Sequence, residues 1–438
     1  MEARSRLLVV LVALCVVSVV AAAAENVTVG QLSSYHGGAV SYNAKSYGAK
    51  GDGHTDDTKA LMAAWKVACG AAGTVTLTIP PGTYYIGPTQ FHGPCKASAL
   101  TFMLQGTLKA ATDLKRFGND WIEFGWVKGL TVAGQNGIID GQGAASWPFN
   151  KCPIRKDCKV LPTVSLISSR ACMEFHLACT NCKMSIKING LLQSVLFVNN
   201  QNTVVRDITS VNSKFFHFAL LTNNNIKMLN LRINAPGTSP NTDGIHIERS
   251  TGVVIADTRI GTGDDCISIG QGNDNIDIQR VHCGPGHGMS VGSLGRYVGE
   301  GDVTRIHVKD MTFEGTMNGV RIKTWENSPT KSVAAHMVFE NMVMKDVQNP
   351  IIIDQKYCPY YNCEHKYVSG VTLQDITFRN IKGTASLPVA VMLRCGVPCQ
   401  GVVLQEIDLK YKGQGGTSSK CENAKAKYVG YQYPKPCA

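Results

Sequence analysis

The sequence has little charge and lacks the basic segments of nucleic-acid-binding proteins. Charged residues make up 17% of the 438 residues, and the 43 lysines and arginines are not gathered in runs. A nucleic-acid partner is therefore not expected, because such proteins cluster Lys and Arg on one face or segment. The formal net charge of +11 favours an acidic polymer as the partner instead. Solubility, or retention at an acidic matrix, explains the same charge equally well.

Long apolar segments are absent after residue 24, so no membrane-spanning helix is expected there. The N-terminus has Arg4 and Arg6, an apolar run over residues 7–20 and alanines at 21–24. This order is typical of a secretory signal peptide, which we place at residues 1–24. A membrane anchor is the alternative, but the run is shorter than the roughly 20 residues that span a bilayer. We therefore expect a secreted, extracellular protein that has no membrane partner after cleavage.

The cysteines lack the paired C-x-x-C motifs of a structural zinc site, apart from Cys179 and Cys182. The chain has 16 cysteines, which fits an oxidising compartment. Short spacings predict three local disulfides and one bridge between neighbouring structural layers: Cys152/Cys158, Cys358/Cys363 and Cys395/Cys399, and Cys266/Cys283.

The region from about residue 200 lacks the 3.6-residue apolar stripes of amphipathic helices. Short segments of alternating Val, Ile and Thr instead begin at Asn or Gly and run up to a polar residue, as in GVVIADTRI from Gly252. The polar position recurs about every 23 to 34 residues, which is typical of a solenoid. We place it at Asp207, Asn230, Asp257, Arg280, Asp310, Asn341, Asp375 and Glu406.

Period-two alternation broken by Gly, Asn and Asp predicts short strands joined by turns. Leucine-rich repeats have a similar period, but their leucine-dense consensus is missing. We therefore predict an all-β chain, a right-handed single-stranded parallel β-helix over residues 25–438, with coils stacked about 4.8 Å apart. A β-sandwich is the competing architecture. Helical spacing of Leu61, Trp65 and Ala68 predicts one short helix over residues 56–69 that caps the open end of the stack.

Four polar clusters fall within the repeats, at residues 241–243 (NTD), 263–265 (GDD), 286–288 (GHG) and 321–323 (RIK). Asp243, Asp265 and His287 are 22 residues apart in turn, close to the length of one coil. We therefore expect these three side chains near one angular position on consecutive coils. Asp264 would lie one residue aside in the same cleft.

Carboxylates stacked about 5 Å apart repel one another, so one of them should keep its proton to higher pH and serve as a general acid. The others stay ionised and can deprotonate a water, which is the arrangement of glycoside hydrolysis. Arg321 and Lys323 alternate on one strand and can bind a substrate carboxylate. Taken singly, each cluster is explained by turn chemistry or a solvated strand face. Four clusters in phase with one repeat are much harder to explain in that way.

The clusters lie in longer strings that resemble the signature motifs of the polygalacturonases, glycoside hydrolase family 28. These strings are SPNTDGIHI at 239–247, GDDCISIG at 263–270, CGPGHGMSVGSLG at 283–295 and NGVRIKTW at 318–325. The resemblance extends from Tyr42 to Cys437 except for one segment, and it is closest to the plant branch and its pollen-type exo-acting enzymes. It implies hydrolysis of the α-1,4 bonds of polygalacturonate or pectin, with inversion and without a metal or organic cofactor.

The resemblance also implies roles for individual residues. Asp264 would be the general acid, while Asp243 and Asp265 would hold the attacking water as bases. His287 would tune the protonation of the acid and help to order the cleft. The substrate-binding residues would be Arg321 and Lys323, which bind the galacturonate carboxylate, with Tyr357 in IIIDQKYC and Asn241. Inversion predicts acid and base carboxylates about 6.5–9.5 Å apart, so that a water fits between them.

Residues 164–193 depart from the resemblance. Without them, LPT joins SVLFVNN as in an uninterrupted coil, and the ends of the segment are compatible with GT and AG splice sites. We interpret the segment as a retained intron or a gene-model artefact. Removing its three cysteines and Cys15 of the signal peptide leaves an even number that suits six disulfides. A genuine surface loop with a redox or metal pair at Cys179 and Cys182 is the alternative.

The sequence therefore predicts a secreted enzyme of the cell wall that acts on pectin as a monomer, with exo-action from the non-reducing end. Three alternatives are an endo-acting polygalacturonase, a calcium-dependent pectate lyase of the same fold and an inactive wall-binding protein or allergen. Product size separates exo from endo cleavage. Unsaturated products and sensitivity to a chelator would indicate the lyase.

Overall fold

The computed structural model describes residues 39–117, 120–150, 193–359 and 367–437. These residues all belong to one compact unit, Tyr35–Ala438. The predicted signal peptide lies outside the described residues, as does the unusual segment up to residue 192. Within the described part of the chain, no helix combines the length and the apolar character needed to cross a membrane.

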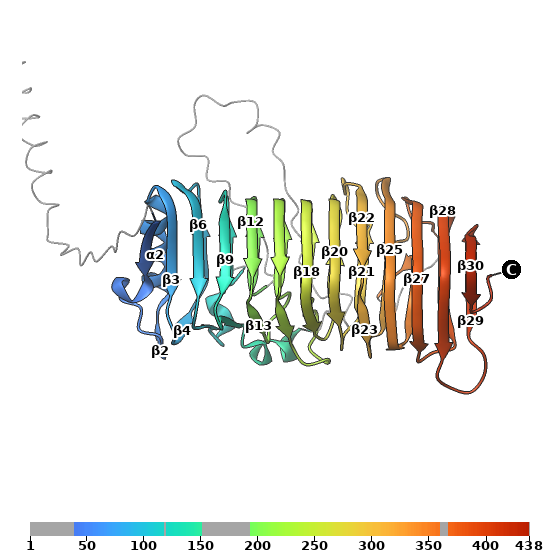
Figure 1. Cartoon of the computed structure of the whole chain (residues 1–438), viewed down its shortest axis with the longest axis horizontal. Coiled ribbons are helices and arrows are strands. Elements are labelled where there is room, and N and C mark those ends of the chain that lie inside the picture. The colour runs from blue at the N-terminus through green and yellow to red at the C-terminus, as the bar shows by residue number, and fades with distance from the viewer. Residues whose placement is uncertain (1–38, 118–119, 151–192, 360–366, 438) are drawn as a thin grey trace, which may run out of the picture. The chain divides into compact units, whose positions relative to one another are not determined.

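Parallel strands stacked coil on coil dominate the described residues (Figure 1). One set of strands, here called the site sheet, consists of β5 (Thr89–His92), β8 (Ile122–Gly125), β11 (Val195–Val198), β14 (Phe218–Leu221), β17 (Ile245–Glu248), β19 (Asp265–Ile269), β21 (Gly288–Leu294), β24 (Asn318–Trp325), β26 (Asn349–Tyr357) and β29 (Ser418–Ala424), joined by part of β28 (Val389–Tyr411).

The remaining strands form a second set, into which β28 also extends. They are β1 (Ala39–Asn43), β2 (Asp52–Asp56), β3 (Gly73–Ile79), β4 (Thr83–Ile86), β6 (Ala97–Leu104), β7 (Thr107–Ala110), β9 (Leu130–Gly134), β10 (Ile138–Asp140), β12 (Gln201–Arg206), β13 (Thr209–Val211), β15 (Asn224–Leu229), β16 (Arg232–Asn234), β18 (Thr251–Gly261), β20 (Asp274–Cys283), β22 (Val303–Lys309), β23 (Thr312–Glu314), β25 (Ser332–Val347), β27 (Val371–Ala385) and β30 (Lys427–Tyr433). The fold is the predicted right-handed parallel β-helix and not a β-sandwich, because the strands pair in parallel from coil to coil.

Residues with a left-handed backbone conformation mark the corners of the coils. Asn and Asp tolerate this conformation better than most residues, which explains why the sequence repeats them. The corner that follows the β12, β15 and β22 segments has φ values of 49–61° at Asp207, Asn230, Asp257, Arg280, Asp310, Asn341, Asn380 and Glu406. Side chains connect successive corners, since the amide of Asn230 donates to Asp207 over 2.8 Å and that of Asn341 donates to Asp310 over 3.0 Å.

The recurring polar position that we placed at Asp375 lies instead at Asn380, one bend later in the coil. Met342 pairs with Ile381, so Asn380 stacks on Asn341, and its amide donates to the Asn341 side chain over 2.8 Å. Asp375 has a φ of 52° but belongs to the preceding corner of the coil. The segments VTLQD and ITFRN, which end at Asp375 and Asn380, look alike in sequence because both are short alternating strands between two bends.

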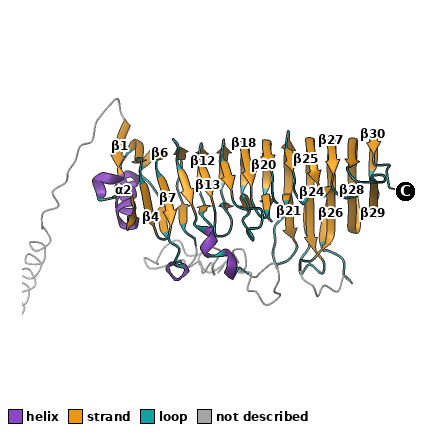
Figure 2. Ribbon diagram, turned by 90° about the horizontal axis from the view of Figure 1, so that it is seen from below, coloured by secondary structure: helices purple, strands orange, loops and turns teal. Residues whose placement is uncertain are grey.

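The predicted capping helix is present as α2 (Thr58–Gly70), at the N-terminal end of the stack (Figure 2). It buries Leu61, Trp65 and Ala68, and the Trp65 ring lies 5.1 Å from that of Phe91 in the first coils. The described residues also contain short 3-10 helices: η1 (Ala44–Tyr47), η2 (Leu114–Arg116), η3 (Gly143–Ala145) and η4 (Trp147–Phe149). The helix thus covers core that the terminal coil would otherwise expose to water.

Disulfides join Cys69 to Cys95, Cys266 to Cys283, Cys395 to Cys399 and Cys421 to Cys437. Two of the predicted pairs, Cys266/Cys283 and Cys395/Cys399, are therefore confirmed. Cys358 is also disulfide-bonded. The other cysteines of the predicted local pairs, Cys152, Cys158 and Cys363, lie outside the described residues.

Candidate active site

The candidate catalytic side chains lie where the chain enters three consecutive strands of the site sheet. Asp243 precedes β17 by two residues, Asp264 and Asp265 stand at the start of β19, and His287 directly precedes β21. Because β17 pairs with β19 and β19 pairs with β21, three coils bring these groups to one edge of the sheet. The Cys266–Cys283 disulfide follows directly on Asp265 and ties its strand to the end of β20.

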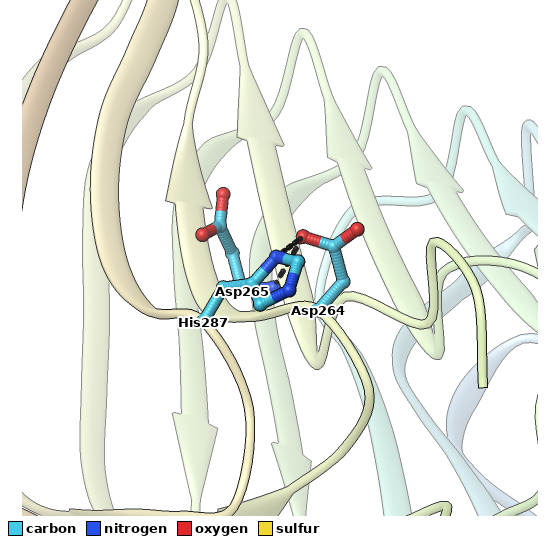
Figure 3. Close-up of side chains that lie close together, drawn as sticks. All are labelled: Asp264, Asp265 and His287. Atoms are coloured by element: carbon cyan, nitrogen blue, oxygen red, sulfur yellow. Dashed lines mark hydrogen bonds and ion pairs between the residues drawn. The ribbon is translucent and has the colours of Figure 1, made fainter. Parts of the chain in front are cut away.

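His287 lies near Asp265 on the next coil, as expected, but it is offset from Asp265 by one residue. Asp265 pairs with Gly288, and the register shifts between Asp265 and Ile267. His287 therefore lies beside Asp264: its backbone N–H donates to the Asp264 carbonyl over 2.8 Å, and its Nδ1 is 2.9 Å from Asp264 Oδ1 (Figure 3). Cys266 is an extra residue of β19 without a partner in β21. The 22-residue spacing between motifs does not show which residue is the extra one, so it does not reveal this shift.

Asp265 is buried, with 2% of its side chain exposed, and binds two cations. Its Oδ1 accepts from Arg321 Nη2 over 3.0 Å and from the Ser290 hydroxyl over 2.9 Å, and its Oδ2 accepts from Lys323 Nζ over 2.7 Å. Burial opposes ionisation, but the charges of Lys323, Arg321 and His287 outweigh it and hold the pKa of Asp265 well below its usual range. The two cations therefore favour the ionised form of Asp265 down to a lower pH than for a free aspartate.

Asp243 is also buried but lacks a directly bound cation among the described residues. Its Oδ2 accepts a hydrogen bond from the Ser268 hydroxyl over 2.7 Å. Burial, followed by the nearby charges of Asp264 and Asp265, raises the pKa of Asp243 well above its usual value, against the smaller opposing effects of Ser268 and Lys323. Two similar carboxylates on adjacent coils therefore have pKa values shifted in opposite directions, because their partners differ.

Asp264 is the most exposed of the three carboxylates, with 17% of its side chain accessible. Its Oδ1 accepts from the backbone N–H of Asp265 over 2.8 Å and contacts His287, and its Oδ2 accepts from the amide of Asn241 over 3.2 Å. Burial opposes the charge of His287, but the hydrogen bond and charge of Asp264 prevail and raise the pKa of His287. The Asn241 side chain is itself held by Asn150, whose amide donates to it over 3.1 Å.

The predicted substrate-binding residues on β24 and β26 lie together. The Tyr357 ring centre lies 5.8 Å from the Arg321 guanidinium and 5.4 Å from Lys323 Nζ, and Trp325 packs edge-on against the same ring at 5.6 Å. Attraction of cations to an aromatic face helps to fix both basic side chains. Arg321 and Lys323 point the same way, as predicted from their alternation, and both contact Asp265.

Asp264 and Asp265 approach each other more closely than the inverting arrangement predicts. One donor atom from each of Asp264, Asp265 and His287 lies within 4.8 Å of the other two. The nearest oxygens of Asp264 and Asp265 are thus closer than the 6.5–9.5 Å expected between an acid and a base. Both oxygens of Asp265 already accept from cations, which is the chemistry of an ion pair and a poor basis for a metal site.

Sequence reasoning missed the serines that support the carboxylates. Ser268 donates to Asp243, and Ser290 donates to Asp265 while accepting from Arg321 Nε over 3.1 Å. Ser268 and Ser290 are direct partners in β19 and β21. Their separation in sequence equals that of Asp243 and Asp265, which was the signal that could have revealed them.

The sequence matches the models of known protein families. The model for glycosyl hydrolases family 28 matches residues 69–185 and 176–430. The chain belongs to glycosyl hydrolases family 28. A shorter match, to the model described as rhamnogalacturonase A/epimerase, pectate lyase-like, covers residues 41–93.

Family-28 relatives resemble this chain along most of its length. An exopolygalacturonase of Platanus acerifolia is 44% identical over 397 residues, which cover 90% of this chain and 96% of the relative. An exopolygalacturonase of Zea mays is 44% identical over 395 residues, covering 89% of this chain and 88% of the relative. A polygalacturonase of Brassica napus is 41% identical over 400 residues, covering 91% and 93%.

Solved structures share the β-helix fold of this family-28 chain. An endo-xylogalacturonan hydrolase from Aspergillus tubingensis has a TM-score of 0.69 at 20% identity and covers 89% of this chain and 100% of its own. An exopolygalacturonase from Thermotoga maritima has a TM-score of 0.66 at 19% identity and covers 90% and 92%. At these identities the likeness concerns the fold alone.

Proposed function

We propose that this family-28 chain is a polygalacturonase that hydrolyses the α-1,4-galacturonosyl bonds of pectin with inversion, releasing galacturonate from the non-reducing end. The observation that carries the proposal is the cluster of three carboxylates in three different environments at the entry to β17 and β19. Hydrolysis of a glycoside needs one group that gives a proton and one that takes it. The exo mode is supported by relatives of 44% identity that are named exopolygalacturonases.

Asp264 is the proposed general acid, because it is the carboxylate that solvent and a substrate can reach. Its Oδ1 already accepts from the Asp265 N–H and contacts His287, whereas Oδ2 has only the long bond from Asn241. The acid proton therefore belongs on Oδ2, from which it can pass to the oxygen of the scissile bond. His287 acts by orienting Asp264. Its charge also stabilises the Asp264 carboxylate that remains after the proton has been transferred.

Asp243 and Asp265 are the proposed bases that hold the attacking water. Asp265 is ionised throughout because Arg321 and Lys323 neutralise it, so it can orient a water without competing for the acid's proton. Asp243 must lose its proton before it can accept one from the water, and its raised pKa places that requirement on the acidic side of the rate profile.

Arg321 and Lys323 are the proposed ligands of the galacturonate carboxylate, with Tyr357 and Asn241 beside the sugar. A guanidinium has five N–H donors and an ammonium has three, and the bonds to Asp265 and Ser290 use only part of them. A substrate carboxylate would therefore share these cations with Asp265. The formal net charge of +11 favours approach of the polyanionic chain.

Secretion, action in the cell wall and a monomeric state belong to the same proposal. Support comes from the basic-apolar-small order of residues 1–24 and from the disulfides, which persist in oxidising compartments. N-terminal sequencing of the secreted protein should begin close after Ala24, and gel filtration should give the mass of one chain.

We further propose that residues 164–193 are absent from the mature protein. Described strands on either side stack in consecutive coils, since β8 pairs with β11 and β10 pairs with β13. The family match is also split into two segments that overlap at residues 176–185. Sequencing of transcripts across codons 163 to 194 is the test, and uniformly spliced messages that keep all of these codons would exclude an artefact.

The test of the function is product analysis on polygalacturonate. We expect galacturonic acid as the sole early product, a rise in reducing ends, and by NMR the β anomer first, because inversion converts an α linkage to a β product. Mixed oligomers as early products would indicate endo action instead of exo action. Unsaturated products would indicate elimination and remove the hydrolytic proposal, and pectin binding without product would indicate a wall-binding protein.

A further inference from the structure

His246 is joined to the site by hydrogen bonds, although no step above uses it. It is the second residue of β17, and 14% of its side chain is exposed. Its Nδ1 lies 2.8 Å from Ser268 Oγ, and the Ser268 hydroxyl donates to Asp243 Oδ2 over 2.7 Å. The Phe216 ring stacks on the imidazole with 4.8 Å between ring centres. The histidine, the serine and the carboxylate therefore form one chain that ends at Asp243.

Strand register builds this chain. His246 and Ser268 are direct partners in the parallel pair of β17 and β19. Partners at the same level of neighbouring parallel strands project from the same face of the sheet, so their side chains meet. Asp243 reaches the same serine because the chain enters β17 only two residues later.

The next coil repeats the arrangement with a different end group. Ser290 is the register partner of Ser268 and donates to Asp265, while Arg321, the partner of Ser290, donates to the serine from Nε. One serine is thus held by a guanidinium, which is always a donor, and the other by an imidazole. An imidazole nitrogen can donate or accept, so its protonation matters.

Counting protons assigns the direction of the bonds. A serine hydroxyl has one proton, and an ionised Asp243 can only accept, so the proton of Ser268 goes to Asp243. His246 Nδ1 must then be the donor to Ser268, which fixes the tautomer from the network. The other nitrogen, Nε2, is buried and has no hydrogen-bond partner among the described residues, and it lies 3.7 Å from Glu248 Oε2, too far for such a bond.

We infer that His246 is a positioning residue whose Nδ1–H commits the single hydroxyl proton of Ser268 to Asp243 and so stabilises that carboxylate in its ionised, water-binding form. The inference deepens the proposed function and rests on the role of Asp243 as a base. Without the donor on Nδ1, the Ser268 hydroxyl can turn away, and Asp243 loses the hydrogen bond that favours its charge.

The surrounding charges make the acidic side of the rate profile sensitive to this bond. Burial and two neighbouring carboxylates already raise the pKa of Asp243, and Ser268 is the largest effect in the opposite direction. The charged groups that face Asp243 are Asp264, Asp265 and Lys323. Those near His246 are Glu248 on its own strand and Arg249, which lies 3.7 Å from Glu248. Replacement of His246 leaves all of them in place.

The test compares two variants of the full chain by the pH dependence of kcat on polygalacturonate. His246→Phe keeps a ring for stacking on Phe216 but removes the donor. We expect the acidic limb of its profile, where kcat falls at low pH, to move up by about one pH unit. His246→Asn loses the ring but can place an amide N–H near the position of Nδ1, and we expect a limb close to that of the wild type. A purely packing role predicts the reverse, with Phe neutral, Asn impaired and neither limb moved.

A double-mutant cycle tests whether His246 acts through the serine. Ser268→Ala should shift the limb at least as far as His246→Phe, and adding His246→Phe to it should cause no further shift. Ser290→Ala, which removes the serine bound to Asp265 on the next coil, should cause a shift that adds to that of His246→Phe. Two results would overturn the inference in an active wild-type background. The shifts of His246→Phe and Ser268→Ala could be additive, or neither substitution could move the acidic limb. A wild type that releases no reducing ends from polygalacturonate overturns the proposed function instead.

Discussion

The site sheet has two halves that place opposite chemistry on the same register positions. In one row, Leu196 and Ala219 are followed by His246, Ser268, Ser290 and Arg321 on successive strands. We call β11 and β14, with the residues that lead into β14, the apolar half, because Leu196, Val198, Phe216, Ala219 and Leu221 form a small buried cluster of their own. The charged half comprises β17, β19, β21 and β24. The coil geometry therefore sets where a side chain points, and the residue at that position decides whether it packs or does chemistry.

The two halves also differ in what stabilises them. Burial of apolar side chains stabilises the first half directly. Burial of charge is costly in the second half unless each charge is paired, and Asp265 is paired with both Arg321 and Lys323. Substitutions in the apolar half should therefore change stability alone, whereas those in the charged half should separate into changes of rate and changes of stability.

The largest expected effect is the loss of rate in Asp264→Asn. The amide has the shape of the carboxyl group but cannot give a proton, so turnover on polygalacturonate should fall by about 10²–10⁴-fold. The free energy of unfolding should change little, because Asp264 is partly exposed and because Arg321 and Lys323 stay paired with Asp265 in the variant. Asp257→Asn, an exposed acid at a corner on the second sheet, is the matched control and should keep full turnover. Equal losses in both variants would mean that charge, and not proton transfer, explains the effect.

The second effect, on stability, comes from Lys323→Met. Methionine fills much the same space but leaves Asp265 buried with one cation fewer, which should cost about 3–5 kcal/mol in the free energy of unfolding. Urea denaturation measures this loss. Lys227→Met, an exposed cation on β15, should stay within about 0.5 kcal/mol of the wild type. A Lys323→Met protein as stable as that control would show that the charged half does not depend on pairing.

The contrast between the halves also explains what the sequence could reveal. Period-two alternation and Asn or Asp at corners predicted the β-helix, because they reflect backbone geometry that every coil repeats. Motif spacing brought Asp243, Asp264, Asp265 and His287 to one edge of the site sheet. It missed the register shift at Asp265, since spacing does not show which residue of a strand is the extra one in a bulge. The repeat pattern also placed one polar position at Asp375, where Asn380 is correct.

Partners across strands were harder to predict than positions along the chain. Ser268, Ser290 and His246 support the carboxylates through contacts between coils, and a serine in an alternating strand looks like any other. Lys323 and Arg321 were expected to bind the substrate, yet both contact Asp265, because a buried carboxylate attracts the nearest cations. Such preferences depend on burial and distance, which the sequence does not contain.

A smaller effect, in the apolar half, is the dependence of stability on pH through His217. This histidine at the entry to β14 is fully buried, and burial lowers its pKa to about 3. The folded chain keeps it neutral, whereas the unfolded chain binds a proton below about pH 6.5, so stability falls as the pH drops from there. The loss from His217 should reach about 2 kcal/mol between pH 7 and pH 5.

His217→Asn isolates that contribution. Its amide can replace Nδ1 in the 2.8 Å bond to Ser210, but it does not titrate. Urea unfolding at pH 7 and pH 5 should therefore show a smaller decline for the variant than for the wild type. Asp265 does not blur the comparison, because the stability from its lowered pKa is present above pH 4 and is lost only in stronger acid. Equal declines in both proteins would mean that His217 is protonated in the folded chain.

The smallest expected effect is that of a chelator, which tests the charged half for hidden metal chemistry. Asp264, Asp265 and His287 offer donor atoms within 4.8 Å of one another, so a cation is geometrically conceivable there. Both oxygens of Asp265 nevertheless accept from Arg321 and Lys323, and a divalent ion would have to displace or repel these charges. Turnover should therefore be unchanged in excess EDTA and should gain nothing from added Ca²⁺. A rate that falls with EDTA and returns with Ca²⁺ would show that the ion outcompetes the two cations, and hydrolysis by carboxylates alone would then be wrong.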